Sequence, residues 1–181
     1  MGQLGTADEF VFRFHARKPG TITTPEGDVA GSIEIEWFRR RHPWARTPSR
    51  CTVRENDGCV AWTMQDDARI GRFYCQILVE DADGTELGTV TSVSRSWFSA
   101  RLHARFEIVV DGATVAFTEP DWKGRIEVRA IDTNVVLAEI AGTRTKSLRY
   151  VQPMPDHVRK VIGAVPYAYL SEEKWGMGSG A

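Results

Sequence analysis

Residues 72–142 decide the fold, because three segments of one pattern follow one another there. They read ILVEDADGTELGTV (77–90), FEIVVDGATVAF (106–117) and IEVRAIDTNVVLAEI (126–140). In each segment an alternating apolar and polar run meets a short turn of Asp, Gly or Asn, and a second alternating run follows. Alternation with a period of two is typical of β-strands, and such turns join antiparallel neighbours. The three segments therefore predict three β-hairpins.

Two more hairpins are predicted before this stretch. TITTPEGDVAGSIEIEW (21–37) turns at Pro-Glu-Gly-Asp, and CTVRENDGCVAWTM (51–64) turns at Asp-Gly. In the second, Cys51 is expected to lie opposite Met64, so the hairpin does not pair its own cysteines. Residues 9–15 (EFVFRFH) alternate with three Phe residues on one face and predict a first strand. Five hairpins and this strand give about eleven to twelve strands.

So many strands, joined mainly by tight turns, are expected to close on themselves, because closure removes exposed strand edges. The predicted fold class is therefore mainly β: an antiparallel barrel, closed or nearly closed, built from repeated hairpins. After Thr145 the pattern changes, and residues 155–170 predict one C-terminal helix. From Gly163 to Leu170 nearly every side chain is apolar, which indicates burial on all sides and makes the helix a candidate to fill the barrel. Pro166 is expected to kink or end it.

The composition is that of an ordinary globular chain. Its 181 residues, of which 42% are hydrophobic and 26% charged, suffice to bury a core in one domain. We expect a flexible leader over residues 1–8, a single barrel domain over residues 9–170 and a flexible tail over residues 171–181. A formal net charge of -1 gives no global bias toward nucleic acid or an anionic membrane, so such partners have to be identified from local charge clusters, and nucleic acid is not an expected partner. Because the first residues lack the apolar stretch of a secretory signal, the expected location is cytoplasmic, including the membrane periphery.

The strongest candidate for a binding site is an acid-free basic and aromatic segment between Glu36 and Glu55. A second acid-free segment of this kind lies between Glu86 and Glu107. Arg forks bind phosphate in a bidentate manner, and Trp favours lipid headgroup interfaces. The ordinary structural explanation is a solvated loop and a charged outward strand face, whose arginines pair with acids elsewhere. The candidate ligand-binding residues are Arg39, Arg40, Arg41, Trp44, Arg46, Trp97, Arg101, His103 and Arg105.

No catalytic motif is recognisable. DADGTE (81–86) begins like a calcium loop, but the twelfth residue is Ser92 instead of Glu, so a plain hairpin turn is expected. The three cysteines lack metal-ligand spacing. An enzyme could still assemble His15, His103 and a carboxylate such as Glu107 from neighbouring strands inside a barrel, because strand-borne sites need no linear motif. We expect no catalytic residue, metal or cofactor.

The hairpins share a strand, a polar turn that usually holds Gly, and then Val or Leu beside Ala or Gly; residues 79–88 show it as V-x-D-x-x-G-x-x-L-G, and one apolar helix follows the hairpins. Over roughly residues 9–170 this arrangement resembles the tubby-like superfamily, which includes the tubby C-terminal domain, the phospholipid scramblase-like proteins and the LURP-one-related proteins. The resemblance implies a twelve-strand barrel around a central hydrophobic helix. It also implies phosphoinositide binding or lipid movement as functions. It assigns no residue, because none of the family's site motifs can be matched here.

These features favour a non-catalytic binding module that contacts anionic lipid headgroups, or another phosphorylated ligand, through its basic and aromatic loops. The first alternative is a protein-interaction or scaffold domain. The second is a barrel that binds a small apolar ligand in its interior, with or without enzymatic activity. A helix that fills the barrel would leave that ligand no cavity.

Overall fold

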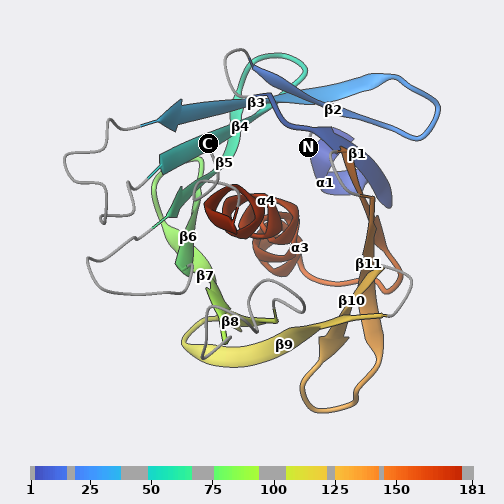
Figure 1. Cartoon of the computed structure of the whole chain (residues 1–181). Coiled ribbons are helices and arrows are strands. Elements are labelled where there is room, and N and C mark those ends of the chain that lie inside the picture. The colour runs from blue at the N-terminus through green and yellow to red at the C-terminus, as the bar shows by residue number, and fades with distance from the viewer. Residues whose placement is uncertain are drawn as a thin grey trace.

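The computed structural model describes residues 3–15, 19–37, 49–66, 76–93, 105–121, 125–142 and 145–176. Within them, twelve antiparallel strands form one closed barrel, which confirms the predicted fold class (Figure 1). Each strand pairs with its neighbours along the chain, and the first pairs with the last to close the ring. The strands are β1 (Glu9–Arg13), β2 (Gly20–Thr23), β3 (Val29–Trp37), β4 (Ser49–Glu55), β5 (Val60–Asp66), β6 (Gln76–Asp81), β7 (Glu86–Ser92), β8 (Phe106–Val110), β9 (Ala113–Pro120), β10 (Ile126–Ala130), β11 (Val136–Ala141) and β12 (Thr145–Tyr150).

The five predicted hairpins are present as β2–β3, β4–β5, β6–β7, β8–β9 and β10–β11. Cys51 lies opposite Met64, as the turn at Asp-Gly predicts. Every hairpin also has a register shift near the end of its first strand, as between Val79 and Glu80. Such a bulge bends a strand and increases its twist. Repetition of hairpin and bulge therefore curls the sheet until its edges meet.

Strand alternation places one row of side chains from each strand inside the barrel. In β8, Phe106, Ile108 and Val110 are buried, whereas Glu107 is exposed on the outer face. Phe10 and Phe12 of β1 alternate in the same way and lie in the core, as predicted for the aromatic face of this strand. The inward rows form one continuous apolar core.

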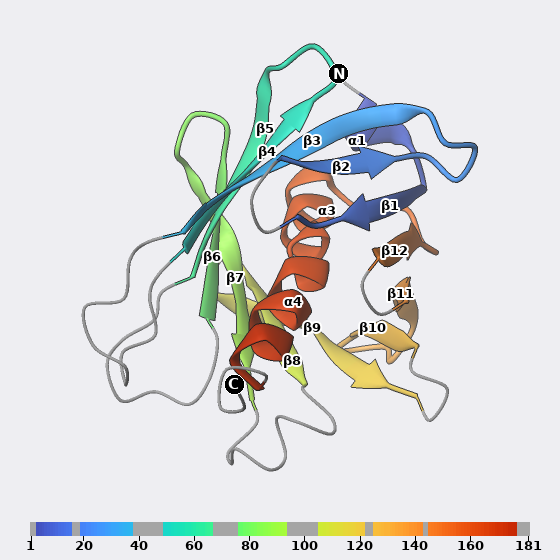
Figure 2. The same ribbon diagram turned by 45° about the horizontal axis from the view of Figure 1, so that its top comes forward.

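A C-terminal helix in two segments fills this interior. Helices α3 (Asp156–Gly163) and α4 (Val165–Gly176) run through the ring of strands (Figures 1 and 2). Residues 161–169 are all buried, as expected for a segment that is apolar on every side. The interruption at Ala164 lies just before Pro166, which lacks an N–H and cannot continue the preceding turn. No described helix is both long enough and apolar enough to cross a membrane.

Two described elements are additional to the sequence pattern. Strand β12 is hard to recognise in the sequence, because Lys146 occupies an inward position and interrupts the apolar alternation. The Lys146 side chain is buried, with 4% of the residue exposed. The short helix α1 (Gln3–Thr6) lies within residues 1–8, the segment predicted to be a flexible leader. Its Leu4 packs into the core and is 5% exposed. At the other terminus, α4 continues past residue 170 into the predicted tail.

Candidate functional site

The structure describes one of the nine residues predicted to bind a ligand. Arg105, just before β8, is exposed, and its Nη2 lies 4.0 Å from Oε1 of Glu119. This exposed pair matches the ordinary structural explanation for that residue and leaves its guanidinium accessible. The other eight predicted residues lie outside the described ranges. They are Arg39, Arg40, Arg41, Trp44, Arg46, Trp97, Arg101 and His103.

The strand order fixes which end of the barrel each connection joins. Because neighbouring strands are antiparallel, odd-numbered strands all finish at one end, here called the loop end. Even-numbered strands finish at the opposite end, the turn end, where the five hairpins turn. β3 finishes at Trp37 and β7 at Ser92, so both predicted basic segments connect strands at the loop end. Figure 2 shows α3 near the turns of β4–β5 and β6–β7, with α4 running toward the loop end.

The connections at the two ends differ in charge. The six loop-end connections contain fourteen of the chain's 23 Lys and Arg residues and two acids, Asp67 and Asp121. The five hairpin turns contain six acids and no Lys or Arg. The loop-end connections are 14–19, 38–48, 67–75, 93–105, 121–125 and 142–144, and the turns are 24–28, 56–59, 82–85, 111–112 and 131–135. Sequence reasoning missed the basic residues Arg17, Lys18, Arg69, Arg72, Lys123, Arg125 and Arg144. The signal that could have identified them is the alternation of basic loops and acidic turns along the chain. It can be recognised once the strand order is known.

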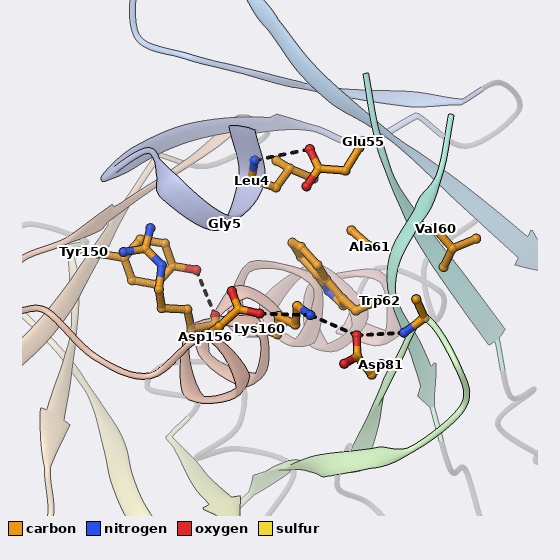
Figure 3. Close-up of a pocket in the computed structure, with 12 residues that line it drawn as sticks. Leu4, Gly5, Glu55, Val60, Ala61, Trp62, Asp81, Tyr150, Asp156 and Lys160 are labelled. Atoms are coloured by element: carbon orange, nitrogen blue, oxygen red, sulfur yellow. Dashed lines mark hydrogen bonds and ion pairs between the residues drawn. The ribbon is translucent and has the colours of Figure 1, made fainter. Parts of the chain in front are cut away.

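A cavity of about 210 Å³ lies at the turn end (Figure 3). Its walls come from α1, β4, β5, β6, β12 and α3, which are far apart in the chain. Leu4, Val60 and Trp62 supply apolar surface, and Glu55 and Lys160 supply charge. Figure 3 shows Leu4 and Glu55 on one side of the cavity and the helix with Lys160 on the other. The cavity therefore combines an apolar wall with charged groups, an arrangement typical of small-molecule sites.

Lys160 forms the centre of an ion network on the helical side of this cavity. Its Nζ lies 2.9 Å from Oδ1 of Asp81 on β6 and 3.0 Å from Oδ2 of Asp156, one helical turn earlier (Figure 3). Burial lowers the pKa of Lys160, but hydrogen bonds to the two carboxylates outweigh it and raise the pKa overall. The hydrogen bond from Lys160 lowers the pKa of Asp81. Lys160 and Asp81 therefore stay charged at neutral pH, and their ion pair connects the helix to the barrel wall.

Replacing Asp81 with Asn is expected to lower the free energy of unfolding by about 0.5–1 kcal/mol at neutral pH, because the pair is partly exposed. Since the pKa of Asp81 is lowered by folding, its contribution is complete above the ordinary aspartate pKa and is lost as pH falls through the folded value. The difference between wild type and Asp81→Asn should therefore shrink in acid. Urea unfolding of both proteins, once at neutral pH and once in acid, measures the difference in the free energy of unfolding. Asp132→Asn, an exposed turn variant, should show neither effect.

Arg159 joins the N-terminal segment and β12 to the helix. Its guanidinium donates a hydrogen bond to the carbonyl oxygen of Ala7, and its Cζ lies 4.1 Å from the centre of the Tyr150 ring. The Tyr150 hydroxyl donates in turn to the Arg159 carbonyl at 2.9 Å. Burial raises the pKa of Tyr150, so this hydroxyl stays protonated and remains a donor. Arg159 thus closes the side of the cavity next to β12.

Glu107, the carboxylate named as an example for the enzymatic alternative, does not lie inside the barrel. Glu107 is exposed on the outer face of β8, so it cannot act inside the barrel. His15 is half-buried beyond the end of β1, and His103 lies outside the described residues. Among the residues that the structure describes, no group of three or more His, Cys, Asp or Glu side chains could hold a metal ion.

Comparison with known proteins leaves the family open. No protein-family model matches the chain, and no curated protein matches it. Among solved structures, the chain is similar to a protein from Arabidopsis thaliana, with 11% sequence identity and a TM-score of 0.48. The similarity covers 92% of this chain and 91% of the Arabidopsis chain.

Proposed function

We propose that the protein is a non-catalytic binding module whose loop end contacts anionic lipid headgroups at the cytoplasmic face of a membrane, or another phosphorylated ligand. The observation that carries the proposal is the opposite charge of the two ends. A Lys or Arg near an anionic membrane contributes about 1 kcal/mol. With a formal net charge of -1, the chain as a whole is not drawn to such a surface. The asymmetry would instead orient it, with the loop end toward the phosphates and the acidic turns away.

The filled interior supports a surface contact over an interior one. Helices α3 and α4 lie in the interior of the barrel, where a small apolar ligand would have to bind, and this supports a surface contact. We also propose that the chain is a member of the tubby-like superfamily. The closed barrel of twelve strands around a buried helix supports that assignment. Within the loop end, Arg39, Arg40 and Arg41 with Trp44 remain the proposed centre of the contact.

The test is co-sedimentation with neutral vesicles and with vesicles that contain a few per cent phosphoinositide. We expect wild type to bind only the anionic vesicles, and to bind them less well as salt is raised. The variant Arg39→Ser, Arg40→Ser, Arg41→Ser should lose about 3 kcal/mol, or roughly 100-fold in affinity, because three surface cations are removed. A parallel titration with soluble inositol phosphate separates headgroup chemistry from a requirement for a membrane.

The matched control is Arg54→Ser, Arg129→Ser, Arg149→Ser, which removes the same charge from the strands of the barrel wall. This control should bind vesicles nearly as well as wild type. Equal loss in both variants would show a response to net charge alone and would contradict a loop-end contact. If wild type fails to bind both anionic vesicles and inositol phosphate, the phosphate proposal is wrong and a protein partner becomes the leading function.

A further inference from the structure

The N-terminal segment, residues 3–7, borders the turn-end cavity without being part of the barrel. It contains helix α1, and its Leu4 lines the cavity (Figure 3). The pairing of β1 begins only at Glu9, so the ring of strands closes without this segment. The carbonyl oxygen of Asp8 accepts a hydrogen bond of 2.7 Å from the N–H of Tyr150. The chain is therefore fixed to the barrel at Asp8, and the segment before it can move while the barrel stays closed.

Three contacts show how the barrel recognises this segment. Leu4 is buried, and a side-chain carbon added at Gly31 of β3 would lie 3.1 Å from its Cδ1. Oε2 of Glu55 accepts a hydrogen bond of 3.3 Å from the N–H of Leu4. The guanidinium of Arg159 donates a hydrogen bond to the carbonyl oxygen of Ala7. Recognition thus uses one aliphatic side chain and two backbone groups that any peptide has.

The segment is held weakly compared with the strands. Helix α1 has four residues, whereas an isolated helix needs about 12–15 to be even marginally stable, so α1 forms because it packs on the barrel. Leu4 is its one described side chain in the buried core, and its burial has to offset the ordering of the whole segment. Segments with few buried contacts open at a lower free energy than the core does. We therefore expect the segment to leave its place without unfolding of the barrel.

A second cavity, of about 330 Å³, borders the same segment. Gly5, Tyr150 and Arg159 line both cavities. Because Gly5 belongs to the N-terminal segment, displacement of the segment removes part of the wall between them and leaves one longer groove. Val151 and Met154 add apolar surface in the second cavity. The groove therefore offers contacts that the segment itself does not use.

We propose that this turn-end groove is a peptide-binding site, which residues 3–7 occupy until a segment of a partner protein displaces them. The partner segment forms one helical turn with a leucine in the place of Leu4, donates an N–H to Glu55 and accepts from Arg159 through a carbonyl. Because the protein's own segment is tethered, the partner needs additional contacts to compete, and the second cavity supplies them. The site lies at the opposite end from the proposed phosphate contact and does not depend on it.

The test uses the full chain and a synthetic peptide with the sequence of residues 2–8, GQLGTAD, blocked at both ends. Leu4→Ser removes the side chain that competes with the peptide. Binding is followed by proton–nitrogen NMR through the backbone N–H groups of Gly31 and Ala61, which lie outside the segment. We expect saturable shifts in Leu4→Ser, with an affinity at least tenfold higher than in wild type, where the intact segment competes. A peptide that itself carries Leu4→Ser should bind neither protein.

Three further variants test where the peptide binds. Ile131→Ser truncates an exposed aliphatic side chain at another hairpin turn, and it should bind the peptide as weakly as wild type. Glu55→Ala, added to Leu4→Ser, should weaken binding roughly tenfold, because it removes the charged acceptor of the peptide N–H. Glu107→Ala in the same background removes an exposed glutamate of β8 and should leave binding unchanged.

The outcomes separate this proposal from its alternatives. No saturable binding to Leu4→Ser, or equal binding of the two peptides, would overturn it. Loss of folding in Leu4→Ser would also overturn it, because the segment would then belong to the cooperative core. A wild-type dimer that Leu4→Ser abolishes in size-exclusion chromatography would contradict a foreign partner and show exchange between two copies. Vesicle binding should be equal in Leu4→Ser and wild type, so this proposal and the loop-end proposal fail independently.

Discussion

Replacement of Ile162 by Ala is expected to lower the free energy of unfolding by about 2–5 kcal/mol. Ile162 lies on α3, is fully buried and belongs to the continuous core. Helix α3 contacts β6, β7 and β8, so the lost side chain leaves a cavity between the helix and the barrel wall. The wall is a closed hydrogen-bonded ring, which resists moving inward to fill that space. We therefore expect a cost toward the upper part of this range.

Denaturant unfolding measures this prediction, and the midpoint should fall while the slope with denaturant stays unchanged. The control is Val151→Ala, because Val151 is 42% exposed and its truncation should change stability by less than about 0.5 kcal/mol. A loss below about 1 kcal/mol in Ile162→Ala would mean that the helix is not part of the cooperative core. Separate transitions for helix and barrel would mean the same.

Replacement of Gly88 by Ala is expected to cost about 3 kcal/mol or more. Gly88 has a φ of 155°, and a side-chain carbon added there would lie 2.1 Å from the carbonyl oxygen of Val109. The φ angle alone costs of order 1–3 kcal/mol for a residue with a side chain. The clash adds to that cost, because the obstructing atom belongs to the backbone of β8 and cannot rotate away. Relief requires β7 and β8 to separate.

Gly84→Ala separates the two causes. Gly84 has a φ of 86°, but nothing lies within 4 Å of an added side-chain carbon. This variant should therefore cost only the backbone strain, about 1–2 kcal/mol. Thermal unfolding of both variants gives the comparison. If Gly88→Ala proves no more destabilising than Gly84→Ala, the close approach of β7 to the Val109 carbonyl is not a constraint on the fold.

Much of the barrel can be predicted from the sequence because its contacts are local. Each hairpin pairs residues no more than 15 positions apart, so alternation and an Asp-Gly turn suffice to identify both strands and, for Cys51 and Met64, their register. The helix interruption is predictable too, because Pro166 imposes it. β12 escapes prediction for two reasons. Lys146 interrupts its apolar row, and half of its pairing is with β1 at the other end of the chain.

The candidate sites differ in the same respect, namely whether their residues are close together in the sequence. The arginine and tryptophan clusters are continuous in sequence, so composition alone selects them. The turn-end cavity is not, because closure of the barrel is what brings Leu4, Glu55, Trp62 and Lys160 together. In the sequence, Glu55 looks like any glutamate before a turn. Among the described residues, the cavity cations Lys160 and Arg159 form ion pairs with Asp81, Asp156 and Asp8.

The pairing of β1 with β12 also determines when the protein can fold during its synthesis. β1 leaves the ribosome first, yet one of its two edges waits for β12 and the interior waits for α3 and α4, which are made last. A chain with such distant contacts folds slowly, and its unpaired edges are templates for aggregation. Barrel closure therefore cannot take place before β12 has been synthesised, and one edge of β1 stays unpaired until then.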